Sequence, residues 1–182
     1  GIGTTKEVSN PNTLDSKNTV IRTAAMDCYI LPCEYMGFDT TSIASSDTFA
    51  ALQTGVVEGL AGSTPAGAYL NYRDIIDYYY VYQMSPEVTQ IMISEKTLAK
   101  LSPEDQKTIV DICRQECANS VNYAKEEDEK YLKLMEDNGI KIVRFSDEEI
   151  EMFAEAVRTN VWPNLAKTYG EDFINELLKL YK

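Results

Sequence analysis

The sequence offers few side chains for covalent chemistry, because its 182 residues include no histidine. That absence excludes a Ser-His-Asp or Cys-His relay, an HExxH zinc site and a histidine general base. Acidic residues are plentiful but scattered, and no two of them stand out as a general acid and base couple. No GxxxxGK[ST] or GxGxxG phosphate loop and no DxDxDG calcium loop is present. We therefore predict that the protein is not an enzyme and has no metal or cofactor.

The four cysteines form two pairs that are close in sequence, Cys28 with Cys33 and Cys113 with Cys117. Neither spacing is the Cx2C of common structural zinc sites, and a disulfide within one helical turn would be strained. Free cysteine packs as a small hydrophobic residue, so we expect buried or free thiols. A cysteine-dependent enzyme is a further hypothesis, but no neighbour in the sequence would activate a thiolate at Cys28 or Cys33.

One basic residue stands at a position that is typical of ligand binding. Arg22 follows Val20 and Ile21, which predict a short strand, and a loop of small residues at 59–65 follows another expected strand at 56–57. In open α/β sheets, ligands bind where strands end in loops. The planar guanidinium of arginine suits a carboxylate, which it can bind through two parallel hydrogen bonds. The alternative is that Arg22 forms a structural salt bridge.

The composition limits the class of partner. The formal net charge is −12 and the sequence pI is about 4.5. A surface this negative repels phosphate backbones, which argues against nucleic acid and anionic membranes as partners. No apolar run approaches the roughly 18 residues that a membrane span needs. The chain opens without a basic and apolar leader, so we expect that any signal peptide has been removed.

Strand and helix patterns alternate along the chain, which predicts an α/β fold. Residues 1–19 are polar and turn-rich, and we expect no regular structure there. A helix should start at Ser46–Asp47 and end at Gly55. Its apolar face is expected at Phe49, Ala50 and Leu52. The other expected strands lie at 78–82, 88–93 and 140–145, and the other expected helices lie at 68–77, 102–138, 146–161 and about 173–181.

The helix that begins after Ser102 is unusually long. Ser102, Pro103 and Asp105 combine an N-cap serine, a proline in the first turn and an acid three residues past the cap. The pattern continues to a stop at Asn138-Gly139, which corresponds to ~50 Å at 1.5 Å per residue. Such a helix should kink or bridge two bodies. A stand-alone helical protein-interaction module that uses this acidic helix is therefore a second functional hypothesis.

Three segments resemble the DctP-type solute receptors of tripartite ATP-independent periplasmic (TRAP) transporters. Residues 15–22 read DSKNTVIR, similar to the family's DLKGLKIR segment. Residues 46–59 read SDTFAALQTGVVEG and resemble the family signature SEVYxALQTGVVDG almost residue for residue. Residues 101–107 read LSPEDQK, which the family shares. The spacing of the segments also fits, so that the resemblance covers nearly the whole chain.

The resemblance implies the fold and the function of an extracytoplasmic receptor. Two α/β lobes, as in other periplasmic binding proteins, would close over a small carboxylate solute and deliver it to a membrane permease. By the same resemblance the chain starts in mid-protein and is a fragment. Residues 1–87 and 128–182 would form the second lobe, while 88–127 would belong to the first lobe and start the lobe-spanning helix. The strand at 88–93 would then lack its own lobe, and exchange of this segment between two copies would give a homodimer.

The resemblance also implies which residues bind the solute. Arg22 is the family arginine that holds the carboxylate. Gly62 stands where the family's GQENP loop has an asparagine, and Ser63 and Thr64 are the nearest hydroxyl donors. Ser45 stands where an aromatic side chain often stacks on the ligand, and Ile2 stands where sialic-acid receptors have a second arginine. These departures argue against sialic acid or a simple C4-dicarboxylate as the solute.

Overall fold

The computed structural model describes residues 1–88 and 90–181, and in this part of the chain six strands form one mixed sheet in the order β3-β2-β4-β1-β5-β6. β2 runs parallel to β3 and β4, β6 runs parallel to β5, and β1 is antiparallel to both β4 and β5. The carboxyl ends of all strands except β1 therefore lie at one edge of the sheet, together with the amino end of β1. The strands are β1 (Ile2–Thr4), β2 (Val20–Thr23), β3 (Asp39–Ser42), β4 (Gly59–Ala61), β5 (Tyr78–Tyr80) and β6 (Lys141–Val143).

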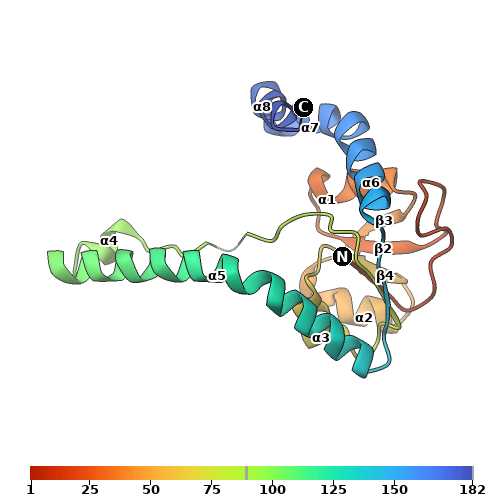
Figure 1. The fold of residues 1–182 in the computed structure, drawn as a ribbon, viewed down its shortest axis with the longest axis horizontal. Helices are drawn as coiled ribbons and strands as arrows, with labels where there is room; N and C mark the ends of the chain where they lie inside the picture. The colour runs from red at the N-terminus through yellow and green to blue at the C-terminus, as the bar shows by residue number, and fades with distance from the viewer. Residues whose placement is uncertain (89, 182) are drawn as a thin grey trace.

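Helices cover both faces of the sheet, and each face has its own hydrophobic core (Figure 1). Side chains alternate between the two cores along a strand, so that Tyr79 packs in one core and Tyr80 in the other. The helices are α1 (Asp27–Tyr35), the 3-10 helix η1 (Ser45–Asp47), α2 (Thr48–Gln53), α3 (Pro65–Tyr72), α4 (Glu95–Leu98), α5 (Pro103–Asp137), α6 (Asp147–Asn160), α7 (Trp162–Tyr169) and α8 (Glu171–Lys179).

The long helix α5 is present as expected and changes its surroundings along its length. Ser102 Oγ accepts a hydrogen bond from the backbone N–H of Asp105 at 3.1 Å, which is the expected N-cap. Near the other end, Leu132 and Met135 are buried against the sheet in the core that also contains helix α3. The amino-terminal half of α5 lies beside α4 and projects away from the sheet and the helices packed on it (Figure 1). No helix within the described ranges is long and apolar enough to cross a membrane.

The expected strand at 88–93 is wrong. Residues 81–88 and 90–94 contain no strand, and Thr89 lies outside the described residues. Val88 and Met92 are 77% and 83% exposed, and Ile91 is 59% exposed. The sequence pattern is that of a strand, but the described chain places no other strand beside it to take up its backbone hydrogen bonds.

Three local expectations also fail, two of them because strand pairing decides them. Residues 2–4 form the strand β1 in the middle of the sheet, although the amino-terminal segment reads as irregular. The strand expected at 56–57 lies instead at Gly59–Ala61, where it pairs with β1 and β2. Helix α2 begins after the turn of η1, which rotates its buried face away from Phe49 and Ala50 to Thr48, Ala51 and Leu52.

Candidate functional site

The predicted site residues lie along one edge of the sheet. Arg22 lies near the carboxyl end of β2, in register with Thr41 of β3 and Leu60 of β4. The loop that starts at Gly62 follows β4, and Ser45 follows β3 after a short connection. Because β2, β3 and β4 are parallel, these three segments leave the sheet on the same side.

Arg22 is half-buried, and its side chain is oriented by the backbone. Its Nε donates a hydrogen bond to the carbonyl oxygen of Ile43 at 2.8 Å. Within residues 1–88 and 90–181, no carboxylate oxygen lies within 4.0 Å of a guanidinium nitrogen of Arg22, so no ion pair is formed. Neither Nη atom of Arg22 has a hydrogen-bond partner among the same residues. The structural salt bridge considered as the alternative is therefore not formed in this part of the chain. One guanidinium nitrogen fixes the group, and the other two can bind an anion.

Gly62 is required by its backbone and by its neighbour. Its φ is +78°, in the region that favours glycine, and a Cβ atom there would lie 3.0 Å from Cε1 of the Tyr29 ring. An asparagine at this position would need a shift of Tyr29. Gly62 therefore offers no polar side chain at the position where the family resemblance predicts an asparagine.

The two hydroxyls of the same loop are engaged differently. Thr64 Oγ1 accepts a hydrogen bond from the backbone N–H of Gly67 at 3.0 Å and caps helix α3. Ser63 Oγ donates to the carbonyl oxygen of Thr64 at 3.3 Å, a long and weak bond. The Ser63 carbonyl oxygen accepts from Tyr79 Oη at 2.7 Å, which fixes the loop on the sheet. Of the two hydroxyls, that of Ser63 is the easier to turn toward a solute.

The remaining predicted positions contribute less. Ser45 is exposed in η1, and its side chain makes no hydrogen bond with the described residues. Ile2 is fully buried in the core, so that position brings no charge to the sheet edge. Neither residue supplies the contact that the family resemblance associates with its position.

Sequence reasoning missed Thr23, which follows Arg22 in β2. Its side chain is fully buried, and its Oγ1 has no hydrogen-bond partner among the described residues. A buried hydroxyl without a partner costs about 1–3 kcal/mol, so a water or ligand atom at this end of β2 would be stabilising. A threonine at the end of a strand that is otherwise apolar at its buried positions was the available signal.

A buried lysine stabilises the other end of β2. Lys17 is 1% exposed, and its Nζ donates to the carbonyl oxygens of Thr13 at 2.6 Å and Asp15 at 3.0 Å. Burial lowers the pKa of this ammonium group, while the nearby Asp15 carboxylate opposes the shift. Lys17 is thus a structural cation that holds the loop before β2, whereas Arg22 is a cation with unused donors. The part of the chain that the structure describes contains no cluster of three or more metal-ligating side chains.

An α/β lobe with an arginine at the carboxyl edge of its sheet, and a long helix that leaves the lobe, is the architecture expected of a two-lobed solute receptor. The family described as bacterial extracellular solute-binding protein, family 7 (DctP), matches residues 2–168. The chain therefore belongs to this family, whose members are receptors and not enzymes.

Similar solved structures are TRAP periplasmic solute-binding proteins. One from Escherichia fergusonii, in an apo open form, has a TM-score of 0.74 at 22% identity, and the match covers 96% of this chain and 57% of that protein. One from Desulfovibrio salexigens with bound orotic acid has a TM-score of 0.75 at 15% identity, and the match covers 99% of this chain and 57% of that protein. One from Pseudomonas putida F1 with bound D-glucuronate has a TM-score of 0.71 at 19% identity, and the match covers 98% of this chain and 55% of that protein.

At these identities the likeness shows the fold, and it confirms the predicted single lobe with a long helix. This chain spans little more than half the length of the structures that it matches. A search of the curated proteins gave no match.

Proposed function

We propose that this chain supplies one side of the solute cleft of a TRAP-type receptor and binds a small organic carboxylate through Arg22. The observation that carries the proposal is the guanidinium of Arg22, held by the Ile43 carbonyl at the sheet edge and unpaired with any acid of the described residues. The two unused Nη amino groups on one planar group match the two oxygens of a carboxylate. Relatives with the same fold bind acids, among them D-glucuronate and succinate.

The loop after β4 completes this side of the cleft. Ser63 would donate a neutral hydrogen bond, and Thr64 would contribute mainly by fixing the start of α3. Ser45 is smaller than the aromatic side chain that the family resemblance associates with its position, and at Gly62 the ring of Tyr29 lies where a side chain would start. We therefore infer a solute other than sialic acid or a simple C4-dicarboxylate. The part of the solute that lies beside these two positions makes few polar contacts with them.

Residues 1–87 and 128–182 are proposed to form the second lobe, and residues 88–127 to belong to the first lobe. The division is supported by burial along α5, because Leu132 is 2% exposed whereas Ile112 and Val121 are 55% and 76% exposed. Figure 1 shows the segment with α4 and the first half of α5 standing apart from the sheet. We refer to residues 88 and 90–127 as the arm and to residues 1–87 and 128–181 as the body.

Delivery of the solute to a membrane permease is proposed from the family. The exposed apolar side chains of the arm are compatible with segment exchange between two copies, and a homodimer stays a prediction. The second hypothesis, a stand-alone helical interaction module, is less favoured because the family match at 2–168 includes the whole of α5.

A thermal-shift screen tests the proposal. The 182-residue chain is mixed with D-glucuronate, D-galacturonate, succinate and orotate, and each titration is repeated with Arg22→Gln. The matched control is Arg114→Gln, which removes an exposed arginine from the arm. We expect at least one acid other than succinate to raise the melting temperature of the wild type and of Arg114→Gln but not of Arg22→Gln. Equal shifts in all three proteins, or no shift with any acid, would contradict the proposal.

A further inference from the structure

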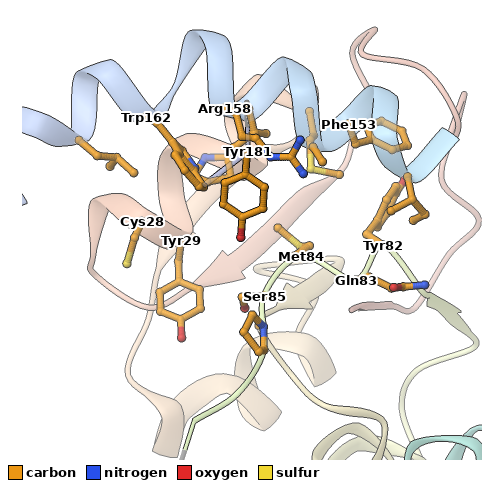
Figure 2. Close-up of a pocket in the computed structure, with 18 residues that line it drawn as sticks. Cys28, Tyr29, Tyr82, Gln83, Met84, Ser85, Phe153, Arg158, Trp162 and Tyr181 are labelled. Carbon is orange, nitrogen blue, oxygen red and sulfur yellow. The ribbon is translucent and has the colours of Figure 1, made fainter. Parts of the chain in front are cut away.

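A cavity of about 480 Å³ lies between α1, α6, α7 and the segment 82–86 that leaves the sheet (Figure 2). This volume is within the range of about 300–1,000 Å³ that is usual for small-molecule sites. Most of its lining is apolar, and five aromatic rings from different parts of the chain contribute to it: Tyr29, Tyr82, Phe153, Trp162 and Tyr181.

The cavity is separate from the proposed carboxylate site. Arg22, Ser63 and Thr64 do not line it, and Gly62 is the one predicted site residue that does. Several of its walls belong to the core on the α1 and α6 face of the sheet, which includes Tyr82 and Phe153. Nothing in the proposed receptor mechanism uses this space.

The charge of the cavity wall restricts what can bind. Arg158 is the one charged side chain of the lining, and its Nη1 lies 2.8 Å from Glu151 Oε1 and 3.8 Å from Glu155 Oε2. Its guanidinium carbon also lies 4.5 Å from the centroid of the Tyr181 ring. Glu151 and Glu155 do not line the cavity, and their side chains are 66% and 68% exposed, whereas that of Arg158 is 18% exposed. The one cation of the lining is thus already paired with carboxylates on the solvent side. An anion would lose its solvation in a mostly apolar cavity whose one cation is already paired, whereas an uncharged ring gains apolar contact without that loss.

The side chains of the lining favour an aromatic molecule over an aliphatic one. Trp162 and Tyr181 are packed edge to face, with ring centroids 5.7 Å apart, and both reach the cavity (Figure 2). Met36 and Met84 add thioether groups, which make favourable contacts with ring edges. Gln83 and Ser85 provide neutral polar groups on the wall formed by the segment 82–86.

We propose that this cavity is a second binding site, which takes an uncharged molecule with one or two aromatic rings. Trp162, Tyr181 and Phe153 surround the rings, and the Arg158–Glu151 pair closes one wall without presenting a free charge. The site shares Gly62 with the proposed carboxylate site but none of Arg22, Ser63 and Thr64, so we expect an aromatic ligand and an acid to bind together.

The one tryptophan of the sequence makes the site directly observable. N-phenyl-1-naphthylamine is an uncharged aromatic probe that fluoresces in apolar surroundings and accepts energy from tryptophan. We expect saturable binding with energy transfer from Trp162. The sulfonated analogue 8-anilinonaphthalene-1-sulfonate has the same rings and a negative charge, and we expect it to bind at least tenfold more weakly. Stronger binding of the anion would overturn the assignment of an uncharged ligand.

Three variants locate the probe. Ala154 lines the cavity on α6, so Ala154→Phe should fill it and weaken binding at least tenfold, whereas Ala50→Phe on the exposed face of α2 is the matched control and should not. Trp162→Phe should abolish the energy transfer but keep the directly excited probe signal. Arg22→Gln should leave both signals unchanged. Equal binding to Ala154→Phe and wild type, or loss of binding in Arg22→Gln, would overturn the proposal of a separate site.

Discussion

The body and the arm differ in how their apolar side chains are covered. In the body, the side chains on both faces of the sheet are buried, down to 2% exposure at Leu132 and 0% at Met135. In the arm, Val88, Met92 and Val121 are at least three-quarters exposed. The same helix α5 passes through both regions, so the difference lies in what the helix packs against and not in its local stability. The body is therefore packed around its own core, whereas the arm leaves large apolar side chains exposed.

The largest contrast is expected from a core truncation. Leu132→Ala removes a buried side chain of the body and should lower the free energy of unfolding by about 2–5 kcal/mol. Ile112→Ala, on the arm portion of the same helix, removes a side chain that is already 55% exposed, so its effect should be about 0.5 kcal/mol or less. Urea unfolding followed by circular dichroism measures both. Similar losses for the two variants would show that the arm is packed in solution.

The cysteines distinguish the two regions by their chemistry. Cys33 is buried in the body, and burial raises the pKa of its thiol to about 12. Cys117 on the arm is exposed. We expect iodoacetamide at pH 8 to modify Cys117 at least ten times faster than Cys33, because Cys33 is both covered and held as a thiol. Mass spectrometry of the digested protein gives the two rates, and the same reaction in urea, where the rates should become similar, is the control. Equal rates in the native protein would contradict the burial of Cys33.

The smallest expected effect concerns two serine caps. Ser146 and Glu149 form a capping box at the start of α6 in the body, with bonds of 3.2 Å and 2.8 Å. Ser146→Ala should lower the free energy of unfolding by about 1 kcal/mol. Ser102→Ala removes the cap of α5 in the arm, where fraying need not loosen the core, so we expect a smaller change in global stability but faster amide exchange near residue 105. A larger loss of global stability from Ser102→Ala would reverse the comparison.

Local signals made part of this structure predictable. The caps at Ser102 and Ser146, the length of α5 and the position of Arg22 at a strand end depend on neighbouring residues in the sequence. β1 was missed because Ile2 pairs with Ala61 and Tyr80, which are distant in sequence. The expected strand at 88–93 failed for the converse reason, since a strand pattern needs a partner strand.

The candidate site, like the fold, could be predicted only in part from the sequence. Arg22 could be found from its type and position, and the family resemblance pointed to the loop at Gly62. The partner of Arg22 is the carbonyl of Ile43, and the pairing of a backbone carbonyl with a distant side chain leaves no mark in the sequence. The cavity beside α6 was likewise invisible, because its lining comes from five stretches of the chain that only the fold brings together.

Calorimetry with a matched pair of ligands tests the central role of Arg22 most directly. The acid that gives the largest thermal shift is titrated beside its primary amide, into the wild type and into Arg22→Gln. We predict that the wild type prefers the acid by at least tenfold, which is about 1.4 kcal/mol, and that Arg22→Gln loses this preference while its affinity for the amide stays nearly the same. An unchanged preference for the acid in Arg22→Gln would contradict the account.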